Sequence, residues 1–122
     1  MKYMLLIHHD EQAWDKLGEA KRQLIFGEFR ELRQQLLSRG QYLDSAPLQP
    51  TSVATSFRVR DGKRLVTDGP FAETREQLGG YFLVDVRDRD EAIAVAAQIP
   101  TARWGTIEVR QLVEAPVAAS GE

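Results

Sequence analysis

The chain has 122 residues, 43% hydrophobic and 28% charged, with a formal net charge of −2. That length and composition predict one soluble globular domain and exclude extensive disorder. Lys and Arg form no block, so nucleic acid and anionic membranes are not expected partners. The sequence contains no cysteine, which excludes disulfides, thiolate catalysis and Cys-based zinc sites.

The N-terminal segment 1–12 does not have the pattern of a targeting signal. Its apolar run is short and ends in histidines and acids, without a small-residue cleavage site. No stretch of the sequence approaches the roughly 20 apolar residues that a membrane span needs. We therefore expect a cytoplasmic protein without membrane association.

Segments 2–8 and 80–86 are predicted to be β-strands with apolar side chains on both faces. In the first, the two alternating sets are Tyr3, Leu5 and Ile7 on one face, and Met4, Leu6 and His8 on the other. A strand that is apolar on both faces is expected to be covered on both sides. These two segments are therefore candidates for central strands.

Two helices and a hairpin are predicted between and around these strands. Apolar residues recur at helical spacing in 25–39, before a glycine suited to end a helix. A second, shorter helix is predicted over 92–99, because Asp88 and Glu91 can form a capping box before it and Pro100 ends it. Residues 53–68 predict a β-hairpin, because Asp61-Gly62 suits a type I′ turn.

The C-terminal part predicts one more strand and then a tail. Residues 106–113 alternate as a strand, whereas 115–122 have the small and polar composition of a flexible C-terminal tail. The predicted single domain therefore covers residues 1–114.

The order of these elements predicts the fold class. It indicates an α+β, ferredoxin-like βαββαβ sandwich, in which an antiparallel sheet carries two helices on one face. One helical layer would leave an apolar sheet face exposed, beyond what monomers usually tolerate. We therefore expect a homodimer with a barrel-like core, a dimeric α+β barrel. The alternative is a monomer in which the long loop after the hairpin covers that face.

His8, His9 and Asp10 form the first candidate cluster for chemistry. Adjacent strand residues point to opposite faces, so these two histidines, the only ones in the chain, do not converge on one metal. We expect no metal and no cofactor. His8 is either a hydrogen-bonded core residue or a general acid or base whose tautomer is fixed by Asp10 or Asp68.

The loop that begins at Asp68 forms the second candidate cluster. Its first residues are typical of a turn, but the connection that follows is longer than a turn requires. It is either a ligand-binding wall, with Asp68 aimed inward and Phe71 inserted as an anchor, or only a long connection. The candidate ligand-binding residues are those of the loop and its neighbouring strands: Arg58, Asp68, Gly69, Pro70, Phe71, Glu73 and Tyr81.

The segment VRDGKRLVTDGPFAETREQLGGYFLVDV, residues 59–86, resembles the defining motif of the DGPF family within the YCII-related (YciI-like) superfamily. MKYMLLIHHDE, LQPTSVATSFRV and IPTARWGTIEVR are also similar to that family, so the resemblance covers residues 1–114. It implies a ferredoxin-like fold assembled as a dimeric α+β barrel. Some members are encoded near extracytoplasmic-function sigma factors, which implies a regulatory or stress setting rather than a specific activity.

The wider superfamily includes a dehydrochlorinase of a chlorinated hydroxyquinol, in which a His and Asp pair is proposed to move protons. The histidine of such members lies on the first helix, where this chain has LIFGEFRELRQQLL without a histidine. The segment that supplies their aspartate is similar to IPTAR here, without an aspartate. That mechanism therefore does not carry over to this chain.

Three functions stay open on the sequence. The favoured one is a small-molecule-binding homodimer linked to a sigma-factor or stress response, because no nucleophile, metal cluster or cofactor fingerprint stands out. The alternative is a cofactor-independent enzyme, a lyase, isomerase or hydrolase, with catalytic residues His8, Asp10 and Asp68 transferring protons beside the loop. The third is a protein-interaction role for the outer face of the 25–39 helix.

Overall fold

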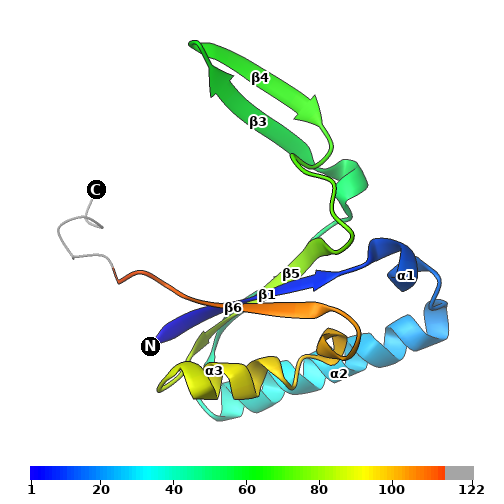
Figure 1. Cartoon of the computed structure of the whole chain (residues 1–122). Helices are drawn as coiled ribbons and strands as arrows, with labels where there is room; N and C mark the ends of the chain where they lie inside the picture. Colours follow the sequence, from blue (N-terminus) through cyan, green and yellow to red (C-terminus); the bar gives the residue numbers. More distant parts are fainter. Residues whose placement is uncertain (115–122) are drawn as a thin grey trace.

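A four-stranded antiparallel sheet, with strand order β2-β5-β1-β6, forms the body of the protein in its computed structural model (Figure 1). The structure describes residues 1–114, so the predicted tail, 115–122, lies outside the described residues. The strands are β1 (Lys2–His9), β2 (Tyr42–Pro47), β5 (Gln77–Asp85) and β6 (Thr106–Gln111). The prediction that β1 and β5 are central strands is confirmed.

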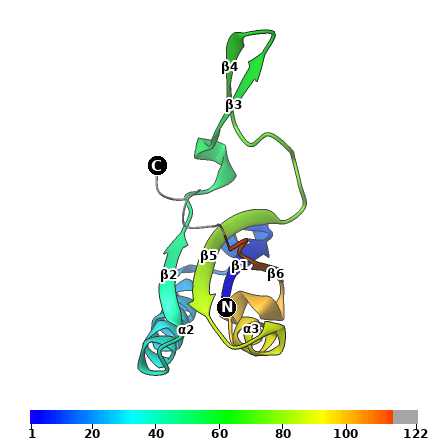
Figure 2. The same ribbon diagram turned by 90° about the vertical axis from the view of Figure 1, so that its left-hand side faces the viewer.

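The longer helices α2 and α3 lie on one face of this sheet (Figures 1 and 2). The helices are α1 (Glu11–Asp15), α2 (Glu19–Ser38) and α3 (Arg89–Ala96), with short 3₁₀ turns η1 (Thr51–Val53) and η2 (Pro100–Arg103). The α+β, ferredoxin-like fold class is therefore confirmed. Among the described residues, no helix has both the length and the apolar character that crossing a bilayer requires.

The ends of α2 follow from local sequence. Gly40 has a φ of 70°, a left-handed conformation that favours glycine, and its N–H donates to the carbonyl of Leu37. On the inner side of the helix, Ile25, Leu32 and Leu36 are buried, and the two leucines belong to the same core cluster as side chains of the sheet. Their helical spacing is the apolar stripe that predicted this helix.

The hydrophobic core lies between the helices and the covered face of the sheet. Leu5 of β1, Val84 of β5 and Leu36 of α2 are each 0% exposed. Full burial of side chains of this size contributes about 1.5–3 kcal/mol each to stability. The sandwich is therefore held mainly by this single apolar layer.

The opposite face of the sheet carries no helix (Figure 2). Here Met4 and Leu6 of β1 lie beside Tyr81 and Leu83 of β5, and all four side chains are only partly buried. We call these four residues the open face. Its apolar character is the feature on which the expectation of a dimer depends.

The hairpin is the main departure from the predicted topology. Strands β3 (Thr55–Arg60) and β4 (Lys63–Asp68) pair only with each other and stand away from the four-stranded sheet (Figures 1 and 2). The turn itself is as predicted, with positive φ at Asp61 (53°) and Gly62 (74°). The second strand of the sheet is instead β2, YLDSAP, which the sequence analysis missed because it shows no apolar alternation.

The loop after β4 also differs from its prediction. Phe71 does not insert as an anchor, since 80% of its surface is exposed. Asp68 is exposed as well and does not border the cavity described below. The loop reaches the sheet at Gln77, where β5 begins.

Candidate functional site

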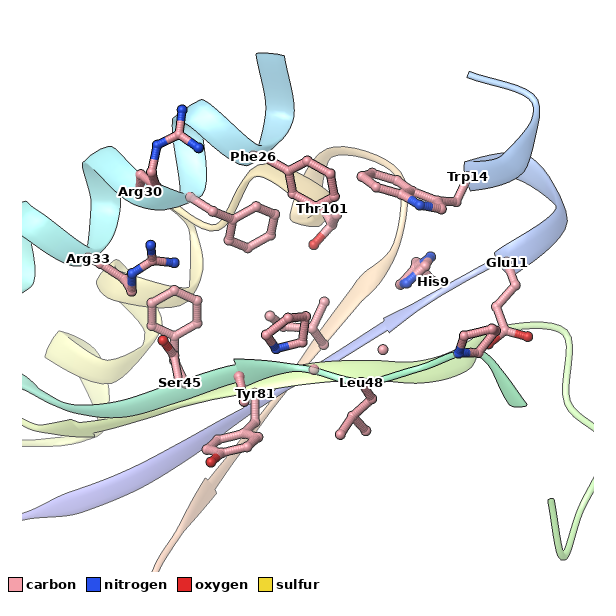
Figure 3. A pocket seen from close by; sticks show the side chains of 18 of the residues that line it. His9, Glu11, Trp14, Phe26, Arg30, Arg33, Ser45, Leu48, Tyr81 and Thr101 are labelled. Atoms are coloured by element: carbon pink, nitrogen blue, oxygen red, sulfur yellow. The ribbon is translucent and has the colours of Figure 1, made fainter. Parts of the chain in front are cut away.

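A cavity of about 470 Å³ lies between helices α1 and α2 and the neighbouring ends of β1, β2 and β5 (Figure 3). This volume is within the range of small-molecule sites. Most of its wall is apolar, supplied by Ile7, Trp14, Phe26, Phe29, Pro47, Leu48, Pro50 and Phe82. The cavity therefore has the size and wall chemistry of a site for a small organic molecule.

The imidazole of His9 forms part of the cavity wall. Its ring lies edge-on to Trp14 at a centroid distance of 5.9 Å, and Trp14 in turn lies edge-on to Phe26 at 5.5 Å. Aromatic pairs at such distances add about 0.5–1.5 kcal/mol beyond their buried area. These contacts fix the end of the cavity nearest to α1.

The Gly79-Gly80 pair makes room for this arrangement. A Cβ on Gly79 would lie 2.3 Å from Nε2 of His9, so no larger residue fits while the ring stays in place. The pairing of β1 with β5 shifts by one residue at this point, so that Gly79 has no opposite partner. At Gly80, a Cβ would lie 2.9 Å from the carbonyl oxygen of Ala46, so this glycine permits the close approach of β2.

Two polar atoms in the wall have no hydrogen-bond partner among the described residues, Oγ1 of Thr101 and Nδ1 of His9. Thr101 is only 3% exposed, and Figure 3 shows its hydroxyl directed toward the space between α2 and the strands. A buried polar group without a partner costs about 1–3 kcal/mol. The hydroxyl is therefore a ready partner for a polar group inside the cavity.

Arg30 and Arg33 of α2 place positive charge at the other end of the cavity. Neither forms an ion pair within residues 1–114. Figure 3 shows the Arg33 guanidinium between α2 and the strands, whereas the Arg30 side chain extends away from them. Arg33 is therefore the cation that faces the interior.

The acidic residues of the wall belong to α1, and one of them is already engaged. The carboxylate of Glu11 accepts hydrogen bonds from Thr51, at 2.9 Å from the backbone nitrogen and 2.6 Å from Oγ1. Asp15, the last residue of α1, also borders the cavity. The cavity thus has a basic end at α2 and an acidic end at α1.

The sequence profile of the YCII-related domain matches residues 1–116. The chain belongs to the YCII-related domain family. It is also 32% identical over 114 residues to a protein of Rhizobium meliloti (strain 1021) described as "Uncharacterized protein R00369". That alignment covers 92% of each of the two chains.

The predicted catalytic residues of this YCII-related protein do not converge. His8 lies on the side of the sheet away from the cavity, and its Nε2 is 3.1 Å from the carboxylate of Glu108 rather than near Asp10 or Asp68. Asp10 caps α1, accepting a 2.9 Å hydrogen bond from the backbone nitrogen of Gln12. Within residues 1–114, His8 therefore forms no hydrogen bond with either of the predicted aspartates.

Of the predicted ligand-binding residues, only Tyr81 borders the cavity. The others lie in the hairpin or the loop and are absent from its wall: Arg58, Asp68, Gly69, Pro70, Phe71 and Glu73. The Tyr81 phenol points to the other side of the strands (Figure 3) and donates a 2.8 Å hydrogen bond to Asp44. This hydrogen bond, with a smaller effect of burial, raises the pKa of Tyr81 above 10.0.

The sequence analysis named His9 in its first candidate cluster but gave it no role, and it missed Arg33 and Thr101, two further functional candidates in the YCII-related domain. A signal for His9 was present, because it shares the strand face of Ile7, which packs under the helices. Arg33 and Thr101 carried no such signal, since only the packing of α2 and η2 brings them to one cavity. Within residues 1–114, no group of three or more His, Cys, Asp or Glu side chains is placed to hold a metal.

Proposed function

We propose that this YCII-related protein is a homodimer that binds a small molecule in the cavity beneath α2. The observation that carries the proposal is the pairing of a cavity of about 470 Å³ with a buried, unpartnered Thr101 hydroxyl. In a cavity that binds nothing, we would expect apolar side chains to fill the space and no polar group to be buried without a hydrogen-bond partner, since such a group lowers stability. A ligand with a polar group would fill the cavity and form a hydrogen bond with the Thr101 hydroxyl.

The dimer is proposed from two apolar surfaces that the described residues leave uncovered. The first is the open face, and the second lies on one side of the hairpin, where Phe57 is 53%, Val59 54% and Val66 63% exposed. A hairpin that packs on nothing is only marginally stable in water. Contact with a second copy stabilises both surfaces at once.

Charge on the open side of the sheet does not oppose this pairing. The basic residues Lys2 and Arg110 lie on the same side as the acidic residues Asp44, Asp85 and Glu108. Because both signs are interspersed, two copies facing one another do not meet as like-charged surfaces. We propose the cytoplasm as its location, on the sequence pattern of residues 1–12, and a sigma-factor-linked or stress response as its setting, on the family resemblance.

The first test is a thermal-shift screen against metabolites and aromatic acids, with hits confirmed by fluorescence. The Trp104→Phe variant leaves Trp14, in the cavity wall, as the single tryptophan. A ligand in the cavity is expected to raise the melting temperature and change the Trp14 emission. The proposal is contradicted if no compound does either.

A matched variant separates the cavity from the loop after β4. Asp68→Asn alters the loop but not the cavity wall, so hits are expected to bind this variant as tightly as the wild type. Loss of binding in Asp68→Asn alone would move the site to the loop. Light scattering on the same samples reports the oligomeric state, and a monomer at micromolar concentration would overturn the dimer.

A further inference from the structure

We infer that the ligand of the cavity is a small organic monoanion with a flat apolar body, whose acid group binds Arg33. This inference rests on the proposed function, because it names the class of molecule that the same cavity takes. Three features carry it: an unpaired cation, an acidic opposite end, and aromatic walls. Each is a property of side chains that border the cavity.

The unpaired cation selects for an acid group. Arg33 is only partly exposed and has no carboxylate partner among the described residues, although its guanidinium lies at the cavity (Figure 3). A guanidinium presents paired N–H donors in the geometry of a carboxylate or phosphate. Arg30, at the rim, adds to the positive potential on the same side.

The acidic end limits the charge of the ligand. Glu11 and Asp15, at the two ends of the short helix α1, both border the cavity. Figure 3 shows Glu11 on the side of Trp14, away from Arg33. A second anionic group on the ligand would meet these carboxylates, and like charges at close range are unfavourable. A monoanion whose only acid group lies at Arg33 avoids that repulsion.

The aromatic walls favour a flat body. The ring centroids of Phe29 and Phe82 lie 6.2 Å apart, and the two ring planes form an angle of 19°. Trp14 closes the far end of the cavity beside Phe26. Apolar walls bind the body of a ligand through the surface that it buries, and a few convergent polar groups orient it through hydrogen bonds. The Thr101 hydroxyl is placed to bind a polar substituent or the acid group itself.

Matched acids, amides and amines test the charge preference directly. The probes are benzoate, phenylacetate and cinnamate, their primary amides, and benzylamine, titrated into the Trp104→Phe protein. We expect the best acid to bind at least about tenfold more tightly than its amide, because a hydrogen bond to a charged group exceeds a neutral one. Benzylamine is expected to bind more weakly than either.

Arg33→Gln tests the residue that reads the charge. This variant is expected to weaken binding of the best acid by about 10- to 100-fold and to leave its amide unchanged. Arg39→Gln is the matched control, because it removes the same charge beyond the end of α2, outside the cavity wall. It should leave the affinity for both probes unchanged.

Thr101→Val supplies a second readout that does not depend on loss of stability. Replacing the unpartnered hydroxyl by a methyl group of similar shape is expected to leave the ligand-free melting temperature unchanged or higher. The affinity for the best acid should nevertheless fall several-fold. Unaltered affinity would remove Thr101 from the site.

The outcomes distinguish the two proposals. Acid and amide of equal affinity, or an acid unaffected by Arg33→Gln, would overturn the anion assignment while the cavity remained a binding site. Tighter binding of the amine would also overturn it. Failure of every probe, together with an empty screen of the wider library, would overturn the proposed function itself.

Discussion

The two faces of the central sheet treat the adjacent residues His8 and His9 in opposite ways. His9 lies under the helices, against Gly79 and Trp14, in the wall of the cavity. His8 lies on the uncovered side, where its Nε2 is 3.1 Å from a carboxylate oxygen of Glu108. One step along a strand therefore moves an imidazole from a candidate ligand site to a partly exposed surface.

The two faces of this one sheet differ in what covers them. The covered face combines a fully buried core at Leu5 and Val84 with a cavity at its end, where glycines permit the close approach of His9 and of β2. The open face has no layer above it and keeps apolar side chains partly exposed. The proposed ligand site lies on the first face, and the proposed contact with another copy lies on the second.

The largest expected effect is on the covered face. Leu5 is 0% exposed, so Leu5→Ala should lower the free energy of unfolding by about 2–5 kcal/mol through lost burial and the cavity left behind. Urea unfolding at fixed protein concentration measures this change. Leu24→Ala, at a position 71% exposed on α2, is the control and should stay within about 0.5 kcal/mol of the wild type. Equal effects would mean that the assigned core is wrong.

The open face is tested by placing a charge on it. Leu6→Lys should weaken the proposed dimer by about 100-fold or more, because each protomer would bury an ammonium without a partner. Light scattering across a dilution series measures the dissociation. Leu24→Lys adds the same charge on exposed α2 and should leave the dimer intact. A dimer that survives Leu6→Lys must use another surface.

The contact of Gly79 with His9 gives a smaller effect that reports on the cavity wall. The Cβ that Gly79→Ala adds would lie 2.3 Å from Nε2 of His9, so the imidazole has to move. We expect this variant to lower the free energy of unfolding by about 1–3 kcal/mol and to change the Trp14 emission. In a His9→Ala background the same substitution should cost much less, because the clash is gone. A double-mutant cycle on urea unfolding measures this coupling; zero coupling would contradict the contact.

The smallest effect concerns Tyr81 on the open face. Its hydrogen bond to Asp44 raises the pKa of the phenol above 10.0 in the folded state. The folded state thus holds this proton more tightly than the unfolded state, so the stabilisation is full below pH 10.0 and declines as the pH rises through the folded-state pKa. The difference between the absorbance titrations of the wild type and of Tyr81→Phe gives the pKa of Tyr81. We expect Asp44→Asn to lower this pKa. No change in Asp44→Asn would contradict the cause.

Much of the fold was predictable from local pattern. The two-faced strands, the helix that ends before Gly40 and the Asp61-Gly62 turn all depend on neighbouring residues alone. Strand β2 was not predictable in the same way. Its sequence has polar residues at Asp44 and Ser45 and takes its place only by pairing with β5.

The site was predicted less well than the fold, because its residues are distant in sequence. One of the two interpretations of the motif around Asp68-Gly69-Pro70 was a ligand-binding wall, but none of the residues of the hairpin or of the loop up to Glu76 borders the cavity. The glycines at the end of the motif do reach the site, and Gly79 makes room there for His9. The motif therefore contributes space to the cavity rather than the polar groups expected of it.

The amino-acid sequence by itself determined which strands are apolar on both faces, where α2 stops and which residues form the hairpin turn, since these depend on spacing and backbone preference. Only the tertiary structure decided that His9 of β1, rather than His8, faces a cavity and that Arg33 and Thr101 border the same cavity. Convergence of side chains from α2, β1 and η2 is set by how the helices pack on the sheet, and packing depends on contacts between residues far apart in the chain.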